Sequence, residues 1–202
     1  MSILSWNCQG LGSLWIIQNL REMRREHFSD FMFLLETKNS SHYVLNMLRS
    51  LGYDKCQLVD PEGLSGGLTL FWKSSYEVEV LQADKRIIDV KVKLGSIGFF
   101  ISFVYGEPVI HLRQEVWDRL TNIGSTRKYA WLVIGDLNER IDNSEKLGGP
   151  PRDEADFYPF RNMIRDCGLL EVPSSGNRFS WAGTRNKVYT QCCLDRALGN
   201  SD

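Results

Sequence analysis

The sequence predicts an α/β (α+β) sandwich, in which two mixed, mostly antiparallel β-sheets pack face to face with helices outside. Two observations lead to this prediction. Segments with helical spacing of apolar residues alternate with short apolar runs near both ends of the chain. A block between residues 66 and 105 is rich in β-branched and aromatic residues and is interrupted by turn residues. Because that block lacks helices, a doubly wound parallel sheet fits the chain poorly.

The first quarter of the chain is expected to alternate strands and helices. Residues 3–6 form a short apolar run, and residues 14–27 space their apolar side chains as a helix does. Residues 30–36 are nearly all apolar, which is typical of a strand buried on both faces. A second helix is predicted over 41–51 and ends at Gly52.

The middle block is predicted to be an antiparallel meander of four strands, over residues 66–72, 76–81, 87–92 and 98–105. After it, the periodicity predicts a helix over 113–123, a buried strand over 130–136 and a helix over 154–166. Two short closing strands are expected over 178–181 and 191–198.

Composition is that of an ordinary globular protein. The 202 residues are 43% hydrophobic and 24% charged, with no repeat or linker, so one domain spanning 1–202 is expected. The net charge of −1 argues against a sequence-reading DNA-binding module, which usually carries a basic excess. It leaves open an enzyme that holds one phosphate with a metal ion and a local basic patch. Neither a secretory signal nor a membrane span is recognisable, so we expect an intracellular monomer without a membrane partner.

The five cysteines show no C-x-x-C spacing, and only three histidines occur, so a zinc site is not expected. A reducing compartment is the simplest interpretation. Cys192 and Cys193 are expected to point to opposite faces of a strand, one buried and one outside.

Polar residues end three of the predicted buried strands. Asn7 ends the first, Glu36 the second and Asp136 the third, with Asn138 two residues further on. Because the ends of neighbouring strands meet at one sheet edge, these side chains are expected to surround one pocket that suits Mg²⁺. Such a pocket would support metal-assisted phosphodiester hydrolysis. The alternative, that each residue only forms a turn or a cap, stays open.

Six short segments occur in a recognisable order, and two more fit the same pattern: SWNCQGLG (5–12), LLETK (34–38), VYGEP (104–108), IGDLNE (134–139), RFSW (178–181) and LDRAL (194–198), with GGLTLFWK (66–73) and SEKLGG (144–149). Over essentially its whole length the chain resembles the endonuclease/exonuclease/phosphatase superfamily, which has the DNase I-like fold. More narrowly, it is similar to the endonuclease domains of plant LINE-type non-LTR retrotransposons.

The resemblance implies roles for particular residues. Glu36 would bind the metal ion, Mg²⁺ or Mn²⁺, and Asn7 would support the metal site and the scissile phosphate. Tyr105 would contact the phosphate. Asp136 would orient or deprotonate the attacking water, and Asn138 would hold the phosphate.

Two further positions match the superfamily near the end of the chain. Ser180 matches a hydroxyl position beside the substrate groove, and Asp195 matches an aspartate that orients a catalytic histidine. Structural alternatives stay open for both, because Ser180 fits a plain strand residue and Asp195 fits a surface pair with Arg196. Tyr105 can likewise end an aromatic strand with its hydroxyl in water.

The loop after RFSW carries Arg185 and Lys187, and we expect this basic pair to bind the phosphate backbone of DNA as substrate-binding residues. The superfamily's last motif, Ser-Asp-His, has no counterpart in the chain. Its histidines are His27, His42 and His111, and none follows LDRAL. We therefore expect a C-terminally truncated domain that lacks its last strand and cleaves poorly.

The resemblance predicts a metal-dependent DNA-nicking endonuclease of retrotransposon type, in active or degenerate form. A full-length relative would carry a reverse transcriptase downstream, and an enzyme acting on chromosomal DNA would work in the nucleus. Two other functions stay open on the sequence, a phosphatase of a small phosphorylated substrate on the same fold and a non-catalytic remnant.

Overall fold

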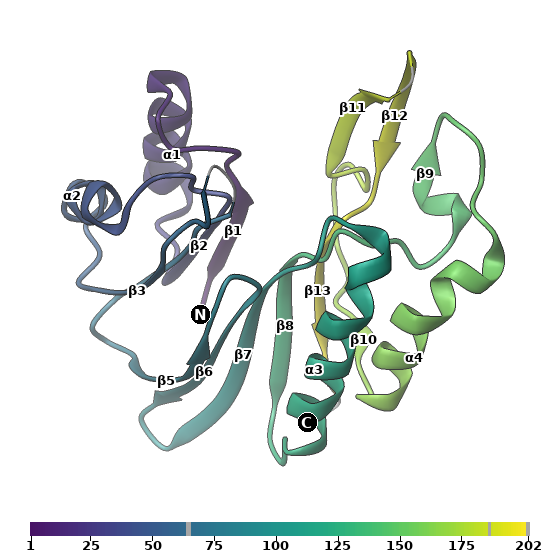
Figure 1. Ribbon diagram of the computed structural model, residues 1–202. Coiled ribbons are helices and arrows are strands. Elements are labelled where there is room, and N and C mark those ends of the chain that lie inside the picture. Colours follow the sequence, from purple (N-terminus) through teal and green to yellow (C-terminus); the bar gives the residue numbers. More distant parts are fainter. Residues whose placement is uncertain (64–65, 186, 201–202) are drawn as a thin grey trace. The chain divides into compact units, whose positions relative to one another are not determined.

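The structure is a computed structural model that describes residues 1–63, 66–185 and 187–200, apart from the side chains of residues 48, 49 and 185. The chain divides into two compact units, Met1–Tyr105 and Gly106–Asp202. Figure 1 labels the elements of each unit. The prediction of one domain over residues 1–202 stays a prediction.

The first unit contains a four-stranded sheet in the order β1-β2-β4-β3. Its strands are β1 (Ile3–Asn7), β2 (Phe31–Leu35), β3 (Lys55–Val59) and β4 (Leu68–Trp72). The strands β1 and β2 run parallel, with Asn7 opposite Leu35, whereas β4 lies antiparallel to both β2 and β3. The parallel pair therefore brings the C-terminal ends of β1 and β2 to the same sheet edge.

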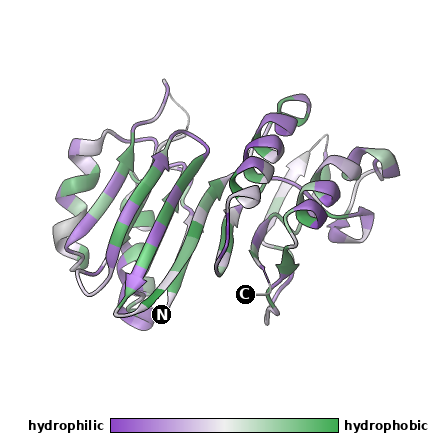
Figure 2. Cartoon of the chain, turned by 90° about the horizontal axis from the view of Figure 1, so that it is seen from below, coloured by the Kyte–Doolittle hydropathy of each residue, from purple (hydrophilic) through white to green (hydrophobic). Residues whose placement is uncertain are grey.

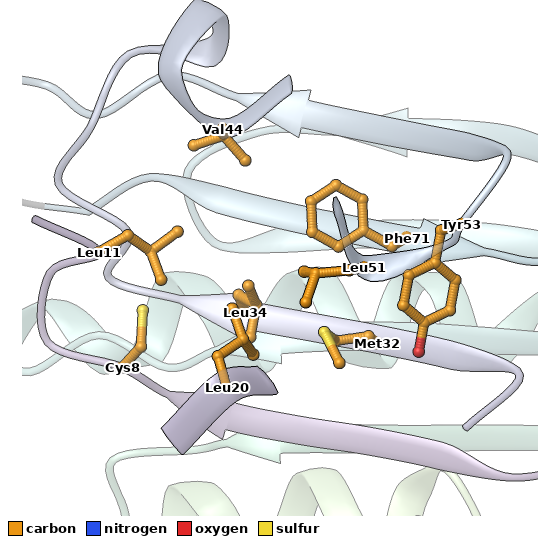
Figure 3. Close-up of a cluster of buried hydrophobic side chains, with 9 residues drawn as sticks. All are labelled: Cys8, Leu11, Leu20, Met32, Leu34, Val44, Leu51, Tyr53 and Phe71. Carbon is orange, nitrogen blue, oxygen red and sulfur yellow. The ribbon is translucent and has the colours of Figure 1, made fainter. Parts of the chain in front are cut away.

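Two helices, α1 (Leu14–His27) and α2 (Ser41–Leu51), cover one face of this sheet. Leu20 of α1 and Val44 of α2 pack with Met32 and Leu34 of β2 in one buried cluster. Figure 3 shows its nine buried members, Cys8, Leu11, Leu20, Met32, Leu34, Val44, Leu51, Tyr53 and Phe71. The cluster fixes the two helices on the sheet by removing apolar surface from water.

The other face of β2 packs on a second sheet of the same unit. This meander consists of β5 (Glu77–Ala83), β6 (Ile87–Leu94) and β7 (Ile97–Tyr105), paired antiparallel in that order. Phe33 and Phe31 of β2 contact Phe103 of β7 with ring centroids 5.2 and 6.3 Å apart. Because alternate residues of β2 enter the two cores, its nearly continuous apolar run is explained. The expected face-to-face packing of two sheets with helices outside is confirmed within this unit.

The second unit contains two small sheets and two helices. In the first sheet β13 (Asp195–Gly199) lies antiparallel between β8 (Trp131–Asp136) and β10 (Leu170–Glu171). In the second, β12 (Val188–Cys192) pairs with β11 (Trp181–Arg185) and β9 (Lys146–Leu147).

The helices of the second unit, α3 (Arg113–Ser125) and α4 (Tyr158–Asp166), pack against each other. Trp117 and Phe160 form this contact, with ring centroids 4.7 Å apart. Short 3₁₀ turns occupy 110–112, 143–145 and 154–157, so the helix predicted over 154–166 begins as a 3₁₀ turn. Figure 2 shows hydrophobic residues concentrated on the strands and hydrophilic residues prominent on the helices. None of the helices in the described residues is long and apolar enough to cross a membrane.

The predicted four-stranded meander is wrong at its first strand. β4 pairs with β2 and β3 instead of joining β5, β6 and β7. The partner strand β3 was not predicted, because its sequence KCQLV is short and begins with an exposed lysine. Its pairing with β4, the next strand along the chain, is not encoded in local periodicity.

The closing strands also differ from the prediction. The run predicted as one strand over 191–198 is two strands, β12 and β13, which belong to different sheets. Cys193 and Leu194 interrupt it, since their backbone N–H groups donate to Glu145 O and Ser180 Oγ. Cys192 is buried and Cys193 half-buried, but Cys193 lies outside the strand, so the alternating-face explanation is wrong. All five cysteines are free thiols.

Arg196, which follows Asp195 in β13, is not part of a surface pair. Its guanidinium is buried and bonds to Glu145 and, at 2.9 Å, to Glu171. This ion pair ties β13 to the 143–145 turn and to β10, so Arg196 has a structural partner other than Asp195.

Candidate active site

The first group of candidate residues lies at one sheet edge of the Met1–Tyr105 unit. Asn7 is the last residue of β1, and Glu36 directly follows β2. Because β1 and β2 are parallel neighbours, the two side chains come from the same edge, as the sequence predicted for these two. Together with Lys38 and Tyr105 they form what we name the Glu36 cluster.

The Glu36 carboxylate is held from both sides. The Tyr105 hydroxyl donates to Glu36 Oε1 at 2.5 Å, and Lys38 Nζ lies 2.9 Å from Oε2. Burial raises the pKa of Glu36, but hydrogen bonds from Tyr105, Lys38 and Asn7 and the charge of Lys38 lower it more, so the pKa lies below its ordinary value. The carboxylate is therefore ionised at neutral pH.

The backbone of this cluster adopts an uncommon conformation. Gln9, Glu36 and Lys38 have φ angles of 50°, 52° and 53°, in the left-handed region that non-glycine residues rarely occupy. Each such residue costs about 1 kcal/mol or more, and they concentrate at functional sites. A hydrogen bond from Thr37 N to Gly67 O holds the strained segment. A Cβ atom at Gly67 would lie 2.3 Å from Thr37 Oγ1, so only glycine permits this approach.

Asn7 has a structural contact as well as its place beside Glu36. Its Oδ1 accepts a hydrogen bond of 3.3 Å from Gln9 N, which stabilises the turn after β1. The turn-forming alternative and the site role thus apply to the same side chain. Asn7 also hydrogen-bonds to Glu36, and a cation would share Oδ1 with Gln9 N, because only the oxygen of a carboxamide binds Mg²⁺.

The donor atoms of the Glu36 cluster fit a hard divalent cation. Mg²⁺ is usually bound through one or two carboxylates, with water and substrate phosphate completing its shell. The cluster offers the ionised Glu36 and the Asn7 carboxamide. Nowhere in the described part of the chain do three or more His, Cys, Asp or Glu side chains gather in a metal-binding cluster. A cation would therefore depend on Glu36, and Lys38 would share this carboxylate with it.

The second group lies in the Gly106–Asp202 unit. Asp136 ends β8 and Asp195 begins β13, and the two residues are direct partners across the antiparallel pair. Asn138, with φ 53°, donates its backbone N–H to Asp136 Oδ1 at 2.9 Å. Ser180 accepts at Oγ from Asp195 N at 3.0 Å. We name these four residues the Asp136 cluster.

Gly106 positions Asn138. The Asn138 Nδ2 donates to Gly106 O at 2.8 Å, and Gly106 N donates to Asp136 O at 2.8 Å. A Cβ atom on Gly106 would lie 2.0 Å from Leu137 O, so any side chain there would displace the segment that carries Asp136 and Asn138.

Asp195 is a carboxyl group in an unfavourable environment. Burial, and then the negative charge of Asp136, raise the pKa of Asp195 to about 6. A hydrogen bond to Ser180 opposes the shift only in part. The two carboxyl groups repel each other when both are ionised.

The basic pair predicted to bind DNA lies on the hairpin of β11 and β12. Arg185 is the last residue of β11, and its side chain lies outside the described residues. Lys187 is exposed in the turn, with φ 65°. Their role as substrate-binding residues stays a prediction.

The structure brings Asn7, Glu36 and Tyr105 together in one unit. It brings Asp136, Asn138, Ser180 and Asp195 together in the other. The expectation that the polar strand ends share one pocket stays a prediction. Sequence reasoning missed Lys38 and Gly106, although both stand inside the quoted motifs LLETK and VYGEP.

The whole chain from residue 4 onward matches one protein family. The model of the Endonuclease/Exonuclease/phosphatase family matches residues 4–202. The chain belongs to this family. No curated protein sequence matches it. The family's name joins nucleases and phosphatases, which are phosphate-ester hydrolases, and its enzymes generally use divalent metal ions.

Several solved structures are similar in fold to this chain over nearly its full length. The 3′-5′ exonuclease NExo from Neisseria meningitidis matches with a TM-score of 0.71 and 16% identity, over 99% of this chain and 87% of that one. The AP endonuclease LMAP from Leishmania major gives 0.73 and 15%, over 99% and 79%. The endonuclease domain of TRAS1, a telomere-specific non-LTR retrotransposon, gives 0.68 and 14%, over 99% and 85%. At these identities the likeness shows the fold, which confirms the predicted α/β sandwich.

Substituting Tyr105 with phenylalanine removes the hydroxyl that donates to Glu36 and keeps the ring. We predict that the pKa of Glu36 rises in this variant, as followed by carboxyl ¹³C NMR during a pH titration. In the native protein the lowered pKa of Glu36 contributes stability that is present above the unfolded pKa and lost as pH falls through the folded pKa. Tyr105→Phe should therefore show a smaller acid-dependent loss of stability. An unshifted Glu36 resonance titration would contradict the hydrogen bond.

Substituting Asp195 with asparagine removes the raised carboxyl. Since the folded pKa of about 6 exceeds the unfolded one, this group stabilises the fold below pH 4 and loses that contribution as pH rises through 6. Asp195→Asn should be more stable than the native protein at pH 7.5, by on the order of 1–2 kcal/mol. The difference should shrink toward pH 4, measured by urea unfolding. The exposed Asp118→Asn serves as control, and equal pH profiles for the native protein and Asp195→Asn would contradict the raised pKa.

Proposed function

We propose that this chain hydrolyses phosphodiester bonds of DNA, as a nicking endonuclease of the retrotransposon type. The observation that carries the proposal is the ionised Glu36 carboxylate, held at a sheet edge beside Asn7 by Tyr105 and Lys38. Membership of the endonuclease/exonuclease/phosphatase family supports the reaction class. The likeness in fold to the TRAS1 endonuclease domain supports the retrotransposon type.

In this proposal the Glu36 cluster holds the cation. Glu36 binds Mg²⁺, or Mn²⁺ in its place, Asn7 orients toward the same cation and phosphate, and the Tyr105 hydroxyl fixes the carboxylate rotamer. When bound, the cation supplies a Lewis acid for the phosphoryl oxygen and neutralises charge on the leaving oxygen. Lys38 keeps the carboxylate ionised and adds a second positive charge next to the phosphate.

In the Asp136 cluster, one residue activates the attacking water and another binds the phosphate. Asp136 accepts a proton from the attacking water or orients it, since its backbone O accepts from Gly106 N and its Oδ1 accepts from Asn138 N, and both bonds fix its position. Asn138 uses one amide hydrogen for Gly106 O, and its second amide hydrogen donates to a phosphate oxygen. Asp195 faces Asp136 from the neighbouring strand β13, and Ser180 Oγ holds the Asp195 backbone in place.

DNA is proposed as the partner on two grounds. A structure related in fold, the 3′ phosphatase NExo from Neisseria, is bound to product DNA hairpin. The β11–β12 hairpin of this chain carries Lys187 in an exposed turn and Arg185 at the end of its strand, a pair suited to a phosphate backbone. Such contacts would position DNA without reading its sequence.

We predict slow, Mg²⁺-dependent nicking of supercoiled plasmid by this 202-residue chain. Slow turnover is expected because the superfamily's Ser-Asp-His motif follows the segment that contains Asp195. In this sequence His27, His42 and His111 all precede Asp195. Loss of one preorganised donor costs on the order of 3–4 kcal/mol, or about 10²–10³ in rate. Glu36→Gln and Asp136→Asn should each abolish the remaining nicking, and EDTA should do the same.

The matched control is Glu62→Gln, which neutralises an exposed carboxylate of the first unit and should leave nicking unchanged. Release of inorganic phosphate from inositol phosphates, without nicking, would favour the phosphatase alternative. Neither activity, with Glu36→Gln indistinguishable from the native protein, would favour the non-catalytic remnant.

A further inference from the structure

A pocket of about 320 Å³ opens in the second unit beside Asn138. Among the described residues, four basic side chains line it, Arg113, Arg140, Lys146 and Arg152, together with one carboxylate, Glu139. The lining therefore carries a clear excess of positive charge. This excess is local, since the net charge of the whole chain is −1.

The Glu139 carboxylate is paired with two other arginines of the pocket. Glu139 is buried, and its two oxygens lie 2.7 Å from Arg113 Nη1 and 3.0 Å from Arg152 Nη1. Lys146 Nζ donates to Pro150 O, a neutral acceptor that leaves its charge uncompensated. Glu139 thus organises two of the arginines, and among the described residues no ion pair joins it to the guanidinium of Arg140.

Arg140 is the unusual member of this group. The residue is only 6% exposed, and its Nη1 has no hydrogen-bond partner within the described part of the chain. Its guanidinium lies 5.6 Å from the centroid of the Phe157 ring. Burial, and then the positive charge of Arg152, lower the pKa of Arg140, although a guanidinium remains protonated at neutral pH.

A buried charge without a partner destabilises a folded protein. Arg140 is therefore poorly explained as a structural residue. An anion in the pocket would compensate the excess charge and give the guanidinium a partner. Asn138 lines the same pocket, so the anion would belong to a molecule that also reaches the proposed catalytic residues.

We propose that this pocket binds a phosphate monoester of the substrate, next to the phosphodiester that is hydrolysed. The role of the anion as part of the substrate rests on the proposed function, whereas its binding does not. A monoester carries a charge of about −1.5 to −2 at pH 7, compared with −1 for a phosphodiester. The uncompensated charges of Arg140 and Lys146 match the dianion better than a backbone phosphate.

The test is calorimetric titration of the chain with inorganic phosphate at low salt in EDTA. We expect saturable binding to the native protein and at least a tenfold loss in Arg140→Met, which keeps the unbranched apolar stem and removes the charge. Arg165→Met is the matched control, because Arg165 is an exposed arginine of α4. It should bind phosphate as the native protein does. No saturable binding, or an equal loss in both variants, would overturn the proposal.

The stability of Arg140→Met distinguishes an anion-binding role of Arg140 from a structural one. In phosphate-free buffer Arg140→Met should raise the free energy of unfolding, because an uncompensated buried charge is removed. A structural arginine would instead lower it on substitution. Added phosphate should raise the midpoint of thermal unfolding in the native protein and in Arg165→Met more than in Arg140→Met. A destabilised Arg140→Met that still binds phosphate would refute the assignment.

Dimethyl phosphate tests the charge argument, because it is a monoanionic mimic of a diester. We expect its affinity to be at least tenfold weaker than that of inorganic phosphate, and equal affinities would refute the monoester assignment. Lys146→Met provides a second variant at the half-buried lysine and should weaken phosphate binding severalfold. These measurements need no catalysis, so inactivity in the nicking assay and failure of phosphate binding remain separate results.

Discussion

The hydrogen bond from Tyr105 to the Glu36 carboxylate, together with the Lys38 ion pair, is the constraint on which the proposed chemistry depends. The two donors come from different elements and meet one carboxylate that follows a buried strand. Their combined effect keeps Glu36 ionised although it is half-buried. An ionised, oriented carboxylate next to a carboxamide is what a hard divalent cation requires. The proposed hydrolysis presupposes that cation.

Both units use the same structural device to build their clusters. A glycine permits a close approach that a side chain would disturb, by the Thr37 side chain at Gly67 for the segment after β2 and by the Leu137 backbone at Gly106 for the segment after β8. The residues carried by these segments, Glu36 and Asn138, then occupy left-handed conformations. Buried Arg140 adds an electrostatic cost to these backbone costs. The chain thus gives up stability at the positions where it would meet cation and phosphate.

Local patterns in the sequence predicted much of this fold. The buried strand over 30–36 and the helix over 41–51 follow from apolar runs and a terminal glycine, and the meeting of Asn7 and Glu36 at one sheet edge was expected from the strand ends. The strand at 55–59 was missed because it is short and begins with an exposed lysine, so it shows no clear strand pattern. The division of 191–198 into two strands depends on bonds to Glu145 and Ser180, which no periodicity reports. An unpaired buried charge is likewise invisible until the fold assembles its surroundings.

Paramagnetic broadening of amide NMR signals by Mn²⁺ tests cation binding at Glu36 directly, because it locates the bound cation without requiring turnover. If Glu36 binds the cation, the signals of Asn7, Glu36 and Thr37 should broaden first at low Mn²⁺ concentrations. Glu36→Gln should remove this selectivity. Broadening that begins elsewhere in the chain and is unchanged in Glu36→Gln would contradict cation binding at Glu36.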